Sequence, residues 1–470
     1  MSNADETYIS LHTLPDVVVP SNDAATARVP TAVPTRGKLG TALRQIRFVL
    51  DPLGTVTQRF ARYGEAYRVE YSGGDLFAFQ HPDHIKDVLV NNAADFDKQH
   101  GAFQTLATIL GDALLTSDGE RWRRQRRLVQ PAFARSRLAQ YAAIMAEEAA
   151  VSAQALADNQ RKLDLSREVN ALTLRIVTRT LFGQSAMDTA RTGAAMLEIN
   201  RWFGRSGVLL GFLPGARKRF KRAKDRLYDD IDNLIAARRA TLDPSVEASD
   251  LLSALIVARD EDGASLSPEE LRDQLLTLYV AGHETTSHAL TWTFYLLSQN
   301  PAALERLRAE HARVLGGRTP TFEDMPQLVY TEQVLKEALR LYPPAYVIPR
   351  HVHKATQVGP YSLPKDSDVV LWTYVTHRNP RFYRDPEQFR PERFEGAEDE
   401  ARPKYAYLPF GAGQRACIGQ AFAMLEAQLV LATCVQRLDF RYAGWRAPGL
   451  ATGVTLSPRG GLPMKVSGRA

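Results

Sequence analysis

The sequence predicts a mainly α-helical domain with small β-sheets, an α+β fold. Apolar residues recur at spacings of three and four over long segments of the 470-residue chain. Alternating, strand-like patterns are short and occur in only a few places. No repeat and no linker composition interrupts the chain after residue 40, so one large domain is the simplest organisation.

The N-terminal region differs in composition from the rest. Residues 1–38 are rich in Ala, Pro, Val, Thr and Asp without a clear period, so we expect a loosely ordered arm. A single catalytic domain should then occupy residues 39–470. Its first element is a hairpin within residues 65–82, where apolar residues alternate around Gly73 and Gly74.

Helices are expected to dominate the chain after this hairpin. Ser267 precedes a proline and two glutamates, which predicts a capped start for a long helix. The basic run at 217–226 is expected to form the first turns of a surface helix. Strand patterns return at 347–358 and 368–371. The expected helices cover 137–159, 168–182, 228–241, 268–299, 302–315 and 420–438.

Composition limits the function classes. The chain has 59 basic and 53 acidic residues, a net charge of +6, which indicates a solvated surface rather than a nucleic-acid partner. Cys417 and Cys434 are too few for a disulfide framework and fit a reducing compartment. We expect a cytoplasmic protein with no transmembrane anchor, because neither a signal peptide nor a run of ~18 apolar residues is present. Cys434 lies mid-helix and is expected to be a core side chain.

The segment 410–423 is the most informative in the chain. Its glycines at 411, 413 and 419 let the backbone pass close to a flat ligand, and the following helix directs its amide dipoles toward Cys417. This arrangement favours a thiolate. The pattern Phe-x-x-Gly-x-Arg-x-Cys-x-Gly resembles the cysteine loop of the cytochrome P450 family.

That resemblance implies a cytochrome P450-like fold with haem b, iron protoporphyrin IX, between the long central helix and the helix of the cysteine loop. It implies Cys417 as the iron ligand. Buried propionates need fixed donors, and four of the implied haem contacts are of that kind: Trp122, Arg126, Arg350 and Arg415. The other implied contacts are Ala281, Gly282, Phe410, Gly411 and Gly419.

The helix that carries Trp122 has further arginines. Arg123, Arg124 and Arg127 point elsewhere than Arg126, and the resemblance implies a basic patch there that docks an electron donor. The alternative is a solvated basic face.

A Glu-x-x-Arg pair occurs about eighty residues before Cys417. Glu337 and Arg340 would share a helix face, which alone usually means a surface pair. The resemblance implies that Arg393 joins them in a buried Glu-Arg-Arg network that braces the haem-side core.

The string Ala-Gly-His-Glu-Thr-Thr lies in the middle of the long predicted helix. Its threonines could simply bond to carbonyls one turn earlier. The resemblance instead implies that Glu284 and Thr285 deliver protons during oxygen activation. His283 and His288 are assigned no role.

The regions that form the substrate pocket in this family are largely apolar here. They imply a lipophilic substrate, such as a fatty acid, a terpenoid or another polycyclic compound. Arg201, Arg205 or His100 could anchor a carboxylate, although surface positions are the simpler interpretation. The pocket residues are Phe103, Leu106, Trp202, Phe203, Tyr346, Val347 and Val454.

The predicted function is a monooxygenase that inserts one oxygen atom of O2 into such a molecule. A separate ferredoxin and ferredoxin reductase would supply electrons, and we expect a monomer. One alternative is a haem-thiolate enzyme that uses peroxide or rearranges oxidised lipids, against which Glu284 and Thr285 argue. Others are a non-catalytic haem-binding protein and a structural cysteine without haem.

Overall fold

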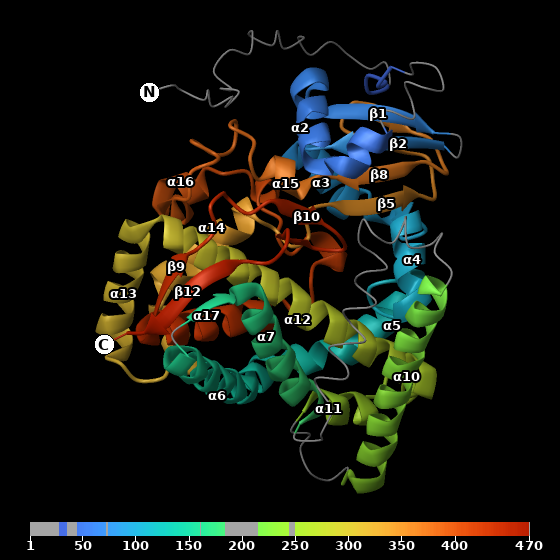
Figure 1. The fold of residues 1–470 in the computed structure, drawn as a ribbon. Coiled ribbons are helices and arrows are strands. Elements are labelled where there is room, and N and C mark those ends of the chain that lie inside the picture. The colour runs from blue at the N-terminus through green and yellow to red at the C-terminus, as the bar shows by residue number, and fades with distance from the viewer. Residues whose placement is uncertain are drawn as a thin grey trace, which may run out of the picture.

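A computed structural model describes residues 28–34, 45–71, 74–159, 161–183, 215–243 and 250–469. A large helical body, which includes α6, α7, α12 and α17, lies beside a smaller region built on a mixed sheet (Figure 1). The α-helices are α2 Pro52–Tyr63, α3 Pro82–Lys86, α4 Gly101–Leu110, α5 Gly119–Val129, α6 Arg135–Asn159, α7 Leu165–Phe182, α10 Ala216–Thr241, α11 Leu251–Val257, α12 Pro268–Gln299, α13 Pro301–Leu315, α14 Val329–Leu341, α15 Thr373–Thr376, α16 Gly396–Glu400 and α17 Gln420–Arg437.

Helix α12 has the predicted bounds, and its start shows why. Ser267 and Glu270 form a capping box, in which the Glu270 N–H donates to Ser267 Oγ at 3.1 Å and the Ser267 N–H donates to the Glu270 carboxylate at 3.0 Å. The helix then runs through the core, where Leu275, Tyr279 and Trp292 are fully buried. Because α12 packs against α7, α14 and α17, it is the central support of the helical body.

Helix α10 begins at Ala216, so the basic run at 217–226 and the apolar pattern from Tyr228 belong to one helix. Its first turns carry exposed basic side chains, and the apolar Phe220, Ala223 and Leu227 pack against the core there. The apolar stripe is therefore too narrow to be recognised by spacing alone. The run at 217–226 forms the first turns of a surface helix, as expected.

The main sheet has the strand order β1-β2-β8-β5-β3. The hairpin is confirmed, with Ala66 opposite Phe79 and Tyr71 opposite Gly74. Strand β8 lies parallel to β2 and antiparallel to β5. The expected strand at 347–358 divides into two. The strands are β1 Ala66–Tyr71, β2 Gly74–Phe79, β3 Phe96–Asp97, β4 Arg161–Asp164, β5 Ile348–Val352, β6 Thr356–Val358, β7 Tyr361–Leu363, β8 Asp368–Leu371, β9 Leu438–Tyr442, β10 Leu450–Thr452, β11 Leu456–Pro458 and β12 Pro463–Gly468.

Part of the expected arm lies along this sheet region. Within residues 28–34, Arg28 forms a bridge with Tyr361 and Ala32 forms one with Arg68. Val33 is 7% exposed and packs in the same apolar cluster as α2. This stretch is therefore held by backbone pairing and apolar contact, although its composition predicted a loose arm. The other residues of 1–38 lie outside the described part of the chain.

Candidate functional site

The cysteine loop is closed by its own backbone. The Cys417 N–H donates to the Phe410 carbonyl at 2.9 Å, and both Gly411 and Gly413 have positive φ, at 71° and 68°. A side chain at Gly413 would clash with the Leu89 carbonyl, so the loop needs glycine there to pack against the helical turn Asp87–Asn91. The loop thus fixes where the sulfur lies, three residues before α17.

Cys417 combines an accessible side chain with dense surroundings. Burial raises the pKa of the Cys417 thiol, while the Gly419 N–H and the charge of Arg126 oppose that increase. A thiolate at neutral pH needs a stronger positive charge at the sulfur, such as a bound metal ion. Cys434 is buried in α17, and burial raises the pKa of its thiol to about 12.

A cluster of cations lies beside the loop. Arg350 is 8% exposed and donates to the Pro349 carbonyl at 2.8 Å; burial, and then repulsion by Arg415, lowers its pKa to about 10. Lys98 is equally shielded and donates to a backbone carbonyl at 2.5 Å, and burial lowers the pKa of Lys98 far below its usual value. Asp118, which pairs with Arg415, supplies the single carboxylate among these four side chains. We call Lys98, Arg350 and Arg415 the cation cluster.

Helix α5 brings its predicted residues to the same region. Arg415 lies over the ring of Trp122 at 4.0 Å from the ring centroid and donates to the Ser117 carbonyl at 2.9 Å. Arg126 donates to the Ala416 carbonyl at 2.9 Å, so its guanidinium binds the cysteine loop itself. Burial lowers the pKa of Arg126, and Cys417 opposes that decrease.

The remaining arginines of α5 do not form the expected basic patch. Arg123 pairs with Glu120, and Arg127 pairs with Glu261 at 2.7 Å. Arg124 pairs with both Asp260 and Glu270, at 2.6 and 3.2 Å. Acidic side chains from the segment before α12 and from its first turn therefore neutralise this face.

The middle of α12 is more exposed to solvent than the rest of this helix. Ala281 is exposed, and Gly282 and Glu284 are partly exposed, between two buried stretches. The side chain that Gly282 lacks would lie 3.2 Å from Val177 of α7, so this glycine allows close packing of α7. Ala281 is the accessible small residue.

The hydroxyls of this segment bond within their helix. Thr285 Oγ1 donates to the Ala281 carbonyl at 2.8 Å, and Thr286 Oγ1 donates to the Gly282 carbonyl at 3.1 Å. These are the hydrogen bonds to carbonyls one turn earlier that the sequence left open as an alternative for the two threonines. Glu284 instead reaches across to another element, because its carboxylate accepts a hydrogen bond from Thr455 Oγ1 at 2.9 Å.

The predicted Glu-Arg-Arg network is present and closed. Glu337, Arg340 and Arg393 are all 0% exposed. The Glu337 carboxylate accepts two hydrogen bonds from Arg340, at 2.7 and 2.8 Å, and one from Arg393 at 2.9 Å. Backbone carbonyls of the segment 377–388 accept further guanidinium protons, and the Glu398 carboxylate accepts one from Arg393 at 3.3 Å.

The predicted pocket residues occupy different environments. Phe103 is buried and lies under Lys98, 4.7 Å from its ammonium group. Tyr346 donates from its hydroxyl to the Gly453 carbonyl at 2.8 Å, next to Val454, which is 43% exposed. Leu106 and Val347 are partly buried. Trp202 and Phe203, with Arg201 and Arg205, lie outside the described residues.

Comparison with known proteins identifies the family. A family model for cytochrome P450 matches residues 34–452. The chain belongs to the cytochrome P450 family. It is 40% identical to cyclooctatin synthase of Streptomyces melanosporofaciens, over 77% of this chain and 80% of that protein. It is 32% identical to pentalenene oxygenase of Streptomyces avermitilis, over 87% of this chain and 90% of that protein.

The fold is that of a P450 haem domain as well. The crystal structure of the cytochrome P450DA haem domain superposes with a TM-score of 0.84 and 24% identity, covering 95% of this chain and 99% of that one. Cytochrome P450 enzymes carry haem iron with a thiolate ligand. Among the described residues, no helix combines the length and the apolar character needed to cross a membrane.

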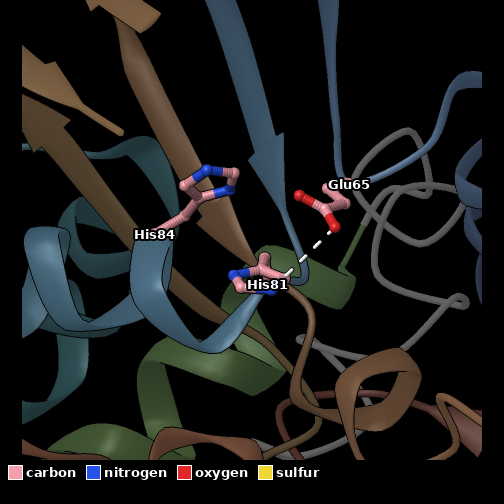
Figure 2. A group of neighbouring side chains, drawn as sticks. All are labelled: Glu65, His81 and His84. Atoms are coloured by element: carbon pink, nitrogen blue, oxygen red, sulfur yellow. Dashed lines mark ion pairs between the residues drawn. The ribbon is translucent and has the colours of Figure 1, made fainter. Parts of the chain in front are cut away.

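A second cluster of possible metal ligands lies away from the cysteine loop. Glu65, His81 and His84 face one another where β1 begins and α3 starts, with ligand atoms within 4.8 Å (Figure 2). The Glu65 carboxylate already pairs with Arg381, and His81 Nδ1 accepts the Asp83 N–H at 3.3 Å as the cap of α3. A divalent ion there would lie beside a guanidinium, so we infer a structural junction.

Four side chains of the P450 site were not predicted from the sequence. Lys98 and Asp118 belong to the surroundings of the cation cluster, and His288 and Thr455 adjoin Glu284. Asp118 precedes a glycine and a basic helix, which is the pattern of a helix cap. No local pattern marks Lys98 or Thr455, because their partners are distant in the sequence.

Proposed function

We propose that this P450 is a monooxygenase that binds haem b through Cys417 and oxidises a terpenoid. The observation that carries the proposal is the accessible Cys417 beside buried cations that outnumber their carboxylate. Haem iron with a thiolate ligand supplies the oxygen activation when it is bound. The protein supplies position, protons and exclusion of water.

The charges of the site fit such a group. Arg350 and Lys98 have lowered pKa values, which means that their charged forms are destabilised by burial. The single negative charge of Asp118 cannot balance the three positive charges of Lys98, Arg350 and Arg415. Two propionates would supply the missing negative charge. Arg350 and Arg415 would hold them, with Lys98 added to the predicted set, while Trp122 supports Arg415 and Arg126 braces the loop at Ala416.

The remaining predicted residues would surround the same group. Phe410, Gly411 and Gly419 shape the loop on the sulfur side. Ala281 and Gly282 lie in the part of α12 that would cover the opposite face, and the exposure of Ala281 supports this assignment. Glu284 and Thr285 would hold and pass protons there. Because Thr285 donates to a carbonyl, its oxygen remains able to accept a hydrogen bond from a water molecule.

The substrate class rests on the apolar side chains and on the relatives. Phe103, Leu106, Tyr346, Val347 and Val454 present apolar surface, and Trp202 and Phe203 complete the predicted set. Cyclooctatin synthase, cyclooctat-9-en-7-ol 5-monooxygenase and pentalenene oxygenase are named for terpenoids, and the second is 35% identical over 81% of this chain and 83% of its own length. A cyclic terpenoid hydrocarbon or alcohol therefore fits better than a fatty acid.

The electron donor and the setting remain part of the proposal. A separate ferredoxin with its reductase would reduce the haem, because the sequence contains no flavin or iron–sulfur motif. Since the face of α5 is neutralised, the donor would have to bind elsewhere on the surface near the cysteine loop. The two unpaired cysteines support a reducing, cytoplasmic setting, and a monomer is the simplest state.

The deciding experiment is the difference spectrum of the reduced protein with carbon monoxide. A thiolate ligand shifts the main band far to the red of that of a histidine-ligated haem. We expect this band in the parent protein and in Cys434→Ala, the matched control, and expect Cys417→Ala to lack it. A histidine-like band, or no haem in the parent protein, would reject the proposal. Product formation that needs peroxide but no reductase would favour the peroxide-using alternative.

A further inference from the structure

The Glu284 carboxylate is tied to a side chain from the C-terminal part of the chain. Thr455 lies in the turn between β10 and β11, and its hydroxyl donates to Glu284 Oε1 at 2.9 Å. The Thr455 hydroxyl oxygen also lies 3.0 Å from Nδ1 of His288, which is one helical turn after Glu284 on α12. Three polar groups thus form a continuous chain across two elements.

The direction of these hydrogen bonds follows from counting protons. A hydroxyl has one proton, and Thr455 gives it to the carboxylate, so His288 Nδ1 must donate to the Thr455 oxygen. Burial, followed by the nearby His283, lowers the pKa of His288 to about 4, so the imidazole is neutral at pH 7. Its single proton is therefore on Nδ1 in this arrangement.

The turn that carries Thr455 is held firmly. Leu456 N–H donates to the Pro344 carbonyl at 3.0 Å, and the Tyr346 hydroxyl donates to the Gly453 carbonyl at 2.8 Å. Thr455 itself is 8% exposed, so little water competes for its hydroxyl. A fixed, shielded donor of this kind restricts the rotamers of its acceptor.

We propose that Thr455 and His288 are positioning residues that hold the Glu284 carboxylate in place for proton delivery. The inference rests on the proposed monooxygenase function and adds two residues to its machinery. Thr285 does not restrain Glu284 through its hydroxyl, because that hydroxyl donates to the Ala281 carbonyl. The Thr455 hydroxyl ties the acid to the β10–β11 turn, and His288 ties that hydroxyl to the next turn of α12.

The test uses two pairs of variants in the haem-loaded enzyme. Thr455→Val and His288→Leu remove the donors, whereas Thr455→Ser keeps the hydroxyl and His288→Asn keeps an N–H near the position of Nδ1. In Thr455→Val and His288→Leu, we expect the product formed per two electrons consumed to fall about tenfold, with KM changed less than about twofold. This decrease is a small part of the ~10²–10⁴-fold rate enhancement that proton transfer contributes. The second pair should recover most of that loss.

A spectroscopic readout separates positioning from general damage. The C–O stretching band of the reduced carbon monoxide complex reports the polar groups near the bound gas. It should move in Thr455→Val and His288→Leu and return in Thr455→Ser and His288→Asn. Thr291→Val is the control, because Thr291 is buried on the same helix and donates only to the Ser287 carbonyl at 2.7 Å. It should leave both the band and the product yield unchanged.

The outcomes that overturn the inference are distinct from those that reject the function. An unmoved C–O band and a parental product yield in both Thr455→Val and His288→Leu would show that Glu284 needs neither residue. If Thr455→Val does not fold, the comparison of His288→Leu with His288→Asn decides alone. A parent protein without the red-shifted band would reject the proposed function, and this inference with it.

Discussion

Two groups of buried charge in this P450 differ in how they are compensated. In the Glu337 network, the Glu337 carboxylate faces two guanidinium groups, Glu398 pairs with one of them, and backbone carbonyls accept most of the other protons. In the cation cluster, Lys98, Arg350 and Arg415 have Asp118 as their one carboxylate among the described residues, and burial lowers the pKa of all three cations. Among the residues that the structure describes, the first group has its charges compensated and the second does not.

This difference separates a structural element from a binding element. A buried ion is costly unless its partners are fixed, so a closed network ties distant segments together. A buried cation that lacks an anion destabilises the chain until an anionic ligand arrives. Both groups looked alike in the sequence, as arginines at the family's positions, and the contacts of their atoms distinguish them.

Breaking the closed network should have the largest effect. Glu337→Ala strands Arg340 and Arg393 in the core, so we expect a loss of about 3–5 kcal/mol in the free energy of unfolding and no haem incorporation. Chemical denaturation and the absorption spectrum measure both. Glu332→Ala is the control on the same helix, because its partner Lys336 is a surface pair worth a few tenths of a kcal/mol. An equal loss in both variants would contradict the distinction.

Removing a cation from the open cluster should weaken haem binding rather than the fold. Arg350→Met removes a charge that burial already disfavours, so we expect the circular dichroism to be unchanged. Haem release should be about ten- to a hundredfold faster, because a charged hydrogen bond is worth about 1.5–3 kcal/mol. Transfer of haem to an acceptor protein measures the rate. Arg308→Met, a shielded arginine paired with Asp439, should release haem at the parental rate.

Acid should act on the closed network through its neighbour His377. This side chain is 0% exposed, its Nε2 accepts the Leu408 N–H at 2.8 Å, and burial followed by Arg340 lowers its pKa to about 3. Between pH 6.5 and 3 the folded protein therefore binds fewer protons than the unfolded chain, so stability falls as the pH falls. From pH 6.5 to 5, His377 should account for about 2 kcal/mol.

The matched variant for this pH dependence is His377→Gln, whose amide oxygen can accept the same N–H without titrating. Urea unfolding at several pH values should show a smaller decrease toward pH 5 in this variant than in the parent. Other buried histidines, such as His311, contribute to both proteins equally. Parallel pH profiles would show that His377 has an ordinary pKa in the folded state.

The sequence predicted features that depend on local patterns. The bounds of α12 followed from a capping box and from apolar spacing, both of which lie within a few residues. The hairpin followed from alternation around two glycines. The start of α10 followed from the basic run at 217–226, although apolar spacing alone marks the helix only from Tyr228. Glu337, Arg340 and Arg393 were found through a family resemblance, which carried information that no local pattern contains.

The sequence did not predict contacts between distant segments. Thr455 and Glu284 are 171 positions apart, and Arg415 reaches Asp118 over 297 positions. The role of Gly282 in packing α7 also depends on a neighbour from elsewhere in the chain. The charge state of α5 was misjudged for the same reason, because its acidic partners come from residues 260–270.

The smallest effect should come from the paired arginines of α5, which are neither buried nor lacking a partner. Arg127 and Glu261 are 55% and 77% exposed, so Arg127→Ala should change the free energy of unfolding by less than about 0.5 kcal/mol. Because Glu261 cancels its charge, the rate of reduction by a ferredoxin should change less than about twofold. Stopped-flow reduction under carbon monoxide measures that rate. A large decrease would show that the donor displaces Glu261 and binds this face, which the pairing argues against.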